Sequence, residues 1–201
     1  MAADRVQKVV ELARRKGLLR PRDLAAVGIP RQYLRLACER GFVQRVARGL
    51  YRAAGEMPSE KATLAEVCTR APSSAICLIS ALSFHELTTQ IPHFVYLAIG
   101  EKARAPRIEH VAVQVFRFSG PAFTEGIETH EIDGAEVRVY CAAKTVADCF
   151  KYRNKLGLDV AVEALRDCLR QRKATVDDLV RYGRICRVER VMRPYMEALL
   201  G

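Results

Sequence analysis

Arginine side chains are concentrated near the amino end of the sequence. Residues 1–55 hold 13 Lys/Arg and 4 Asp/Glu, so they carry +9 of the chain's net charge of +10. Guanidinium groups bind phosphate oxygens and can also contact the edge of a guanine base. This concentration of cations predicts a polyanionic partner, either nucleic acid or an anionic membrane surface.

A helix predicted over residues 30–40 has two faces of different character. Its apolar residues recur at helical spacing and are Tyr33, Leu34, Ala37 and Cys38. The opposite face carries polar residues near the start of the helix, namely Arg31, Gln32 and Arg35. Arg can pair with O6 and N7 of guanine, and Gln can pair with N6 and N7 of adenine. This face is therefore the candidate for reading bases in the major groove.

Two more helices and a hairpin are expected around this helix. Apolar spacing predicts helices over residues 4–16, 21–27 and 30–40, and then strands over 42–46 and 50–52. This order is that of a winged helix-turn-helix domain. A membrane anchor is disfavoured because the first helix has a narrow apolar stripe and lacks exposed aromatic residues. We therefore predict a DNA-binding domain in residues 1–55.

Further cations flank the predicted reading helix. Arg48 lies in the loop between the two strands, where a basic wing can follow the DNA backbone or enter the minor groove. Arg20 and Arg22, at the start of the second helix, are placed to meet phosphates. The full set of expected DNA-binding residues is Arg20, Arg22, Arg31, Gln32, Arg35, Arg45, Arg48 and Arg52.

Residues 56–201 are nearly neutral, with 20 Lys/Arg and 19 Asp/Glu, and are predicted to form a second domain. The expected helices cover residues 60–69, 74–86, 143–153, 158–171, 175–186 and 188–200. The expected strands cover residues 93–99, 111–118, 127–132 and 136–141, the last two joined by an Asp133-Gly134 turn. The fold class is therefore α+β: a winged helix-turn-helix, then a mixed α/β domain with a small, mainly antiparallel sheet and a C-terminal helical bundle.

No sequence signature of an enzyme is present. The chain lacks Gly-x-Gly-x-x-Gly, P-loop and Gly-x-Ser-x-Gly motifs, and His85-Glu86 has no second His at the spacing of a zinc protease. Its seven cysteines include no Cys-x-x-Cys pair. We therefore expect the cysteines to be small, buried apolar residues in a reducing cytoplasm rather than ligands of a metal. No signal peptide, membrane span, cofactor or metal is expected.

A polar cluster stands out in the predicted helix 143–153. It contains Lys144, Thr145, Asp148, Lys151 and Arg153. Lys144 and Asp148 are four residues apart and can pair along the helix, which is the interpretation we favour. The alternative is that the cluster forms a polar surface for a partner or for nucleic acid.

Four segments together resemble the AbiEi antitoxins of type IV toxin–antitoxin systems, with similarity over nearly the whole chain. They are RVARGLYRAAG, SALSFHELTTQIP, VRVYCAAKTVADCFKYRNKLGLDVAVEAL and VMRPYMEALL. The resemblance implies that the first domain binds inverted repeats in its own promoter and represses it. It also implies that the second domain, with Lys144, Thr145, Asp148 and Arg153, counters a nucleotidyltransferase-like toxin without a stable complex.

The sequence also allows a second function. Solitary members of such families act as plain regulators, so the second domain could instead sense a small ligand or bind a protein partner. A nucleotidyltransferase-like gene beside this one would favour the antitoxin, and its absence would favour the sensor.

Overall fold

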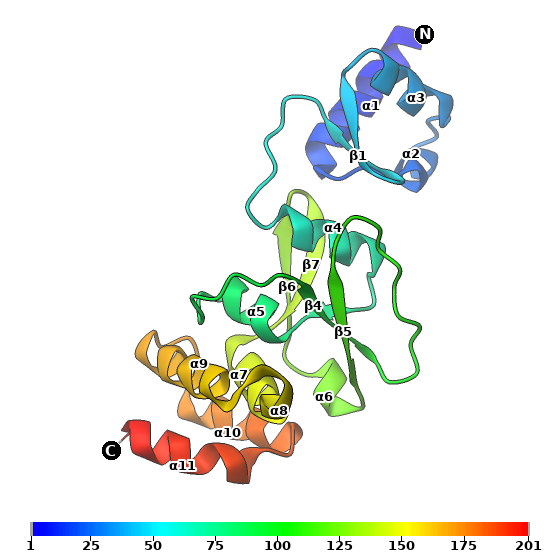
Figure 1. Cartoon of the computed structure of the whole chain (residues 1–201). Helices are drawn as coiled ribbons and strands as arrows, with labels where there is room; N and C mark the ends of the chain where they lie inside the picture. Colours follow the sequence, from blue (N-terminus) through cyan, green and yellow to red (C-terminus); the bar gives the residue numbers. More distant parts are fainter. Residues whose placement is uncertain (1, 201) are drawn as a thin grey trace. The chain divides into compact units, whose positions relative to one another are not determined.

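The computed structural model describes residues 2–200 and divides the chain into two compact units (Figure 1). The first unit comprises Met1–Glu66 together with Glu131–Glu136. The second comprises Val67–His130 and Val137–Gly201. The first unit thus extends beyond residue 55 and includes one distant segment of the chain.

The first unit contains three helices followed by a two-stranded antiparallel sheet. The elements are α1 (Ala2–Lys16), α2 (Pro21–Ala26), α3 (Gln32–Glu39), β1 (Val43–Ala47) and β2 (Leu50–Ala53). Val9 and Ala13 of α1 are fully buried in one core with Ala37 of α3. The helical spacing of apolar residues therefore predicted both the order of the elements and the faces that pack.

The second unit is built on a five-stranded sheet in the order β5-β4-β3-β7-β6. The strands are β3 (Ala75–Ile76), β4 (Val95–Gly100), β5 (Val113–Phe118), β6 (Ile127–Ile132) and β7 (Ala135–Tyr140). β3 pairs antiparallel with β4, whereas β4 pairs parallel with β5 and β3 pairs parallel with β7. The sheet is therefore mixed, with a larger parallel share than the sequence suggested, because a long connection rather than a tight turn joins β4 to β5.

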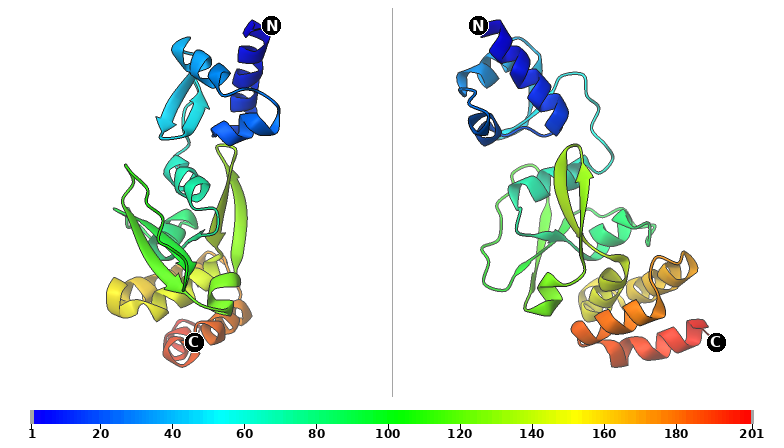
Figure 2. Two further views of the ribbon diagram at one scale, coloured as in Figure 1. Left: turned by 90° about the vertical axis from the view of Figure 1, so that its right-hand side faces the viewer. Right: turned by 180° about the vertical axis from the view of Figure 1, so that it is seen from behind.

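The C-terminal helices, those that follow β7, gather at one end of this sheet (Figures 1 and 2). The helices that follow β2 are α4 (Ala62–Arg70), α5 (Leu78–Phe84), α6 (Pro121–Thr124), α7 (Ala142–Lys151), α8 (Arg153–Leu156), α9 (Leu158–Arg170), α10 (Val176–Ile185) and α11 (Glu189–Leu200). α7 lies at the centre of the C-terminal helices, because its nine consecutive residues from Ala142 to Phe150 are buried. Its apolar neighbours come from α5, α9, α10 and α11.

Two features of the second unit differ from the sequence-based expectation. The helix expected over 74–86 begins only at Leu78, because Ala75 and Ile76 form the central strand β3. The short helices α6 and α8 were not expected. By contrast, the turn expected at Asp133-Gly134, which the division assigns to the first unit, is present, and both residues have the positive φ angles, 49° and 70°, of a type I′ hairpin turn.

Candidate nucleic-acid interface

Helix α3 presents its polar residues on the face opposite to the core. Leu34 and Ala37 are buried, whereas Arg31, Gln32 and Arg35 are all exposed. Arg31 occupies the position before the first helical residue, so its side chain lies at the amino end of α3. The three residues proposed to read bases therefore share one accessible helix end.

Arg35 is highly exposed, with 84% of its side chain accessible. Its Nε donates a hydrogen bond of 2.7 Å to Oε1 of Glu39, one turn further along α3. This bond raises the pKa of Arg35 above its ordinary value. Glu39 therefore holds the guanidinium along the exposed face of α3. The bond uses Nε, so the two Nη groups take no part in it.

The β1–β2 hairpin carries two further exposed arginines, one in its turn and one on β1. Arg48 is exposed and precedes Gly49, whose φ of +75° suits glycine in a tight turn. Arg45 is exposed on β1, and its Nε donates to the carbonyl oxygen of Ala47 at 3.3 Å. The strand pairing shifts register between Arg45 and Ala47, so the hairpin has a bulge beside its turn.

Arg52 does not share this exposure and is a correction to the expected set. It is only 5% exposed, and its Nη2 donates to Oδ2 of Asp133 at 2.9 Å within the first unit. The sequence contained a signal for this, because Leu50 and Arg52 are two residues apart on a strand and so share a face. Arg52 therefore supports the hairpin from its inner side.

The amino end of α2 has one exposed and one half-buried arginine. Arg22 is exposed, as expected for a phosphate contact. Arg20 is half-buried, and its Nε lies 3.6 Å from Oδ2 of Asp23. Asp23 also accepts from the backbone N–H of Arg20 at 2.7 Å and from Nζ of Lys16 at 3.0 Å. Asp23 in the first turn of α2 thus holds Arg20 at the start of this helix.

The polar cluster of the second unit is largely inside the protein. Lys144, Thr145 and Asp148 have no more than 1% of their side chains exposed, and Nζ of Lys144 lies 2.7 and 2.6 Å from the two carboxylate oxygens of Asp148. Thr145 donates from Oγ1 to the carbonyl oxygen of Tyr140 at 3.1 Å. The pairing favoured from the sequence is confirmed, and the alternative of a polar surface made by these residues is wrong.

The other two members of this cluster lie at or just after the carboxyl end of α7 and bind backbone carbonyl groups. Lys151 is exposed, and its Nζ donates to the carbonyl oxygen of Cys186 at 3.2 Å. Arg153 is half-buried and donates from Nη1 to the carbonyl oxygen of Phe150 at 2.9 Å. The five residues therefore make bonds within the second unit and do not form one common surface.

The described residues, 2–200, were also compared with the requirements of a metal site, a disulfide and a membrane span. No group of three or more His, Cys, Asp and Glu side chains there is arranged to hold a metal ion. All seven cysteines are free; five are buried, and Cys38 and Cys141 are half-buried. In the same range, no helix has the length and apolar character needed to cross a bilayer.

A model of a known protein family matches part of the first unit. Residues 7–54 match the family model described as "Transcriptional regulator, AbiEi antitoxin". The resemblance to AbiEi antitoxins is thereby confirmed, and it is carried by the segment that includes α3 and the β1–β2 hairpin. The three quoted segments beyond residue 54 lie outside this match, and the search of curated proteins found no match for the chain.

Proposed function

We propose that this chain is a transcriptional autorepressor and an antitoxin of a type IV toxin–antitoxin operon. Residues 1–55 form a winged helix-turn-helix domain that binds inverted repeats in the operon's own promoter. Residues 56–201 counter a nucleotidyltransferase-like toxin in the cytoplasm without a stable complex. No catalytic step by this chain is part of the proposal.

The observation that carries the DNA-binding part is the division of α3 into two faces. Burial of Leu34 and Ala37 fixes the helix on the core, while Arg31, Gln32 and Arg35 remain accessible. A recognition helix needs this division because one face must pack and the other must enter the major groove. Arg48 on the hairpin and Arg22 on α2 add exposed cations on neighbouring elements of the same unit.

Binding to duplex DNA from the gene's upstream region tests this proposal. Contacts to about five phosphates give a slope of roughly −4 to −5 when the logarithm of the binding constant is plotted against that of the salt concentration. Fluorescence anisotropy with a labelled duplex measures this slope, and footprinting on the same region locates the repeats. A flat salt response would contradict the proposal.

The antitoxin part is supported by the family description and has its own test. A nucleotidyltransferase-like gene should lie beside this one, and its product should slow growth when expressed alone. Expression of the full chain should restore growth. Because no stable complex is proposed, the two proteins should not elute together in size-exclusion chromatography.

A second candidate function is a regulator whose second domain senses a small ligand. One observation favours it: an arginine-lined hollow in the second unit, remote in sequence from α3.

A further inference from the structure

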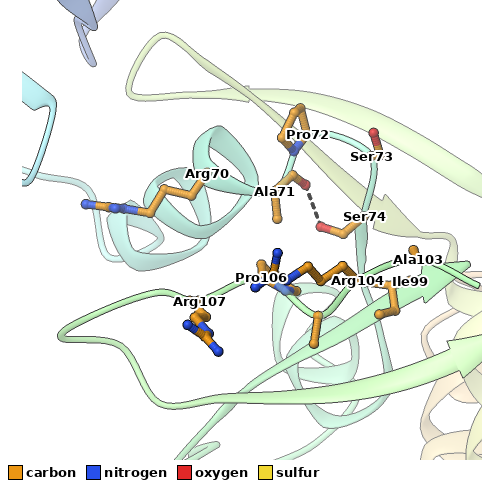
Figure 3. A pocket seen from close by; sticks show the side chains of 11 residues that line it. Arg70, Ala71, Pro72, Ser73, Ser74, Ile99, Ala103, Arg104, Pro106 and Arg107 are labelled. Atoms are coloured by element: carbon orange, nitrogen blue, oxygen red, sulfur yellow. Dashed lines mark hydrogen bonds between the residues drawn. The ribbon is translucent and has the colours of Figure 1, made fainter.

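The hollow lies within the second unit and has a volume of about 410 Å³. One wall is the segment 70–74, which joins α4 to β3, and the other is the loop 103–107, which follows β4 (Figure 3). Clefts that hold small ligands typically measure about 300–1,000 Å³. The hollow is therefore large enough for a small organic molecule rather than only for a single ion.

The charged side chains that line the hollow are all positive. Three arginines, Arg70, Arg104 and Arg107, are among the lining residues, which include no Asp or Glu. Arg104 and Arg107 are exposed, and neither forms an ion pair with a carboxylate of residues 2–200. In Figure 3 Arg104 extends toward the Ala71–Pro72 wall, Arg107 lies further out on the same loop, and Arg70 points away from both. Arg104 and Arg107 are thus the cations best placed for a ligand.

Side-chain hydrogen bonds fix both walls. Arg117 donates from Nη1 to the carbonyl oxygens of Glu101 and Ala103, each at 2.7 Å, and so holds the start of the loop. On the opposite wall, Arg138 donates to the carbonyl oxygen of Pro72 at 3.2 Å, and Ser74 donates to that of Ala71 at 2.6 Å. The hollow is therefore preformed, which lowers the entropic cost of binding.

The lining combines two kinds of surface. Ala71, Pro72, Ile99 and Pro106 supply apolar contacts, while the two loop arginines supply paired N–H donors. Guanidinium groups bind phosphate oxygens in a fork, and apolar walls favour a flat ring system. We propose that this hollow binds a nucleoside phosphate, with the phosphate on Arg104 and Arg107 and the base against the apolar wall.

This site is separate from the proposed promoter contact. Residues 56–201 carry a net charge of only +1, so the arginines of the hollow are a local feature and not part of a general excess. Phosphate could also reach them as part of a DNA backbone. The experiment must therefore compare a free nucleotide with duplex DNA.

Titration of the full-length protein with ADP carrying an anthraniloyl fluorophore tests the proposal. We expect saturable binding, displaced by unlabelled ADP, and a Kd at least tenfold higher in the double variant Arg104→Ala/Arg107→Ala. The matched control is Arg190→Ala, which removes an exposed arginine on α11 outside the hollow and should change the Kd less than twofold. All these arginines are exposed, so equal thermal melting curves will show that the variants are folded.

Two results would overturn the proposal. One is inorganic phosphate displacing the probe as effectively as ADP, because the apolar wall would then contribute nothing. The other is no binding of the probe, together with weaker duplex binding by the double variant and a salt slope reduced by about two, which would assign the hollow to the DNA backbone. Since the probe is titrated without DNA, its result does not depend on whether α3 reads a promoter.

Discussion

The ammonium group of Lys144 lies within 2.7 Å of both carboxylate oxygens of Asp148, and neither side chain is accessible to solvent beyond 1%. The ammonium also sits 4.0 Å from the centre of the Tyr140 ring and 4.9 Å from that of Phe118. Gly126 packs against the base of the Lys144 side chain, since a Cβ at that position would lie 2.9 Å from the Cβ of Lys144. Burial raises the pKa of Asp148, and the ammonium opposes that rise.

Replacing one partner of this pair should strongly destabilise the second unit. Lys144→Met leaves the Asp148 carboxylate buried without its ion-pair partner, a change that typically costs about 3–5 kcal/mol. The free energy of unfolding from urea titrations, followed by circular dichroism, measures the loss. The double variant Lys144→Met/Asp148→Leu should be more stable than Lys144→Met, because it removes both charges.

An exposed ion pair in the same unit provides the control. Arg193 bonds to Glu189 at 3.3 Å with 62% of its side chain exposed, and Arg193→Met should cost less than about 1 kcal/mol. Equal losses from Lys144→Met and Arg193→Met would show that the buried pair has no special role.

The helices and their packing faces could largely be predicted from the sequence. Helical periodicity places Leu34 and Ala37 inside and Arg35 outside, and the spacing of Lys144 and Asp148 predicts their pairing. These features depend on residues that are close in the chain. The spacing of residues within one helix is therefore enough to predict these features.

Features that depend on distant segments could not be predicted in this way. The burial of Lys144 depends in part on Phe118, which comes from the distant strand β5. The short apolar run at Ala75 and Ile76 is a strand only because β4 and β7 flank it. The burial of Arg52 depends on Asp133, 81 residues away.

Base reading and backbone contact should separate in two single variants. Arg35→Ala should cost roughly 1–3 kcal/mol on promoter DNA and relax the preference at one or two bases, because it removes a groove contact. Arg22→Ala should weaken promoter and random duplexes alike, because a phosphate contact carries no sequence information. Competition anisotropy with both duplexes measures the difference. Identical behaviour of the two variants on both duplexes would show that α3 is not the reading helix.

Repression and antitoxin activity should be separable in the full-length protein. The triple variant Arg31→Ala/Arg35→Ala/Arg48→Ala removes exposed cations from the first unit and leaves the residues of the second unit unchanged. We expect it to lose repression of a promoter–reporter fusion and still to relieve the growth defect caused by the neighbouring toxin. Loss of toxin relief at normal protein levels would instead place antitoxin function in the first unit.

The stability of the first unit should depend on Asp23 at acidic pH. Desolvation alone would raise the pKa of Asp23, but the hydrogen bonds from Lys16 and from the backbone of Arg20 outweigh it and lower the pKa. A lowered pKa means stabilisation that is complete above the unfolded value of about 3.9 and is lost as the pH falls through the folded value. Asp23→Asn weakens the charge-assisted hydrogen bonds of this side chain and should therefore cost about 1–2 kcal/mol at pH 7 and much less near pH 2.

Thermal unfolding of the wild type and of Asp23→Asn at pH 7, 4 and 2 measures this convergence. Asp4→Asn is the control, because Asp4 pairs with Lys8 at the surface with 64% of its side chain exposed. It should shift the melting temperature little at any pH. A constant difference between wild type and Asp23→Asn across this range would contradict the assigned pKa direction.

The buried cysteines should resist alkylation until the protein unfolds. Burial raises the pKa of the Cys149 and Cys186 thiols far above the ordinary range and that of Cys168 to about 11. Because the thiolate is the reacting form, iodoacetamide at pH 7.5 should label only the half-buried Cys38 and Cys141, and slowly, since burial raises the pKa of both. Mass spectrometry should find all seven sites modified in urea. Rapid labelling of Cys149 in the native protein would mean that α7 leaves its core readily, which its nine consecutive buried residues argue against.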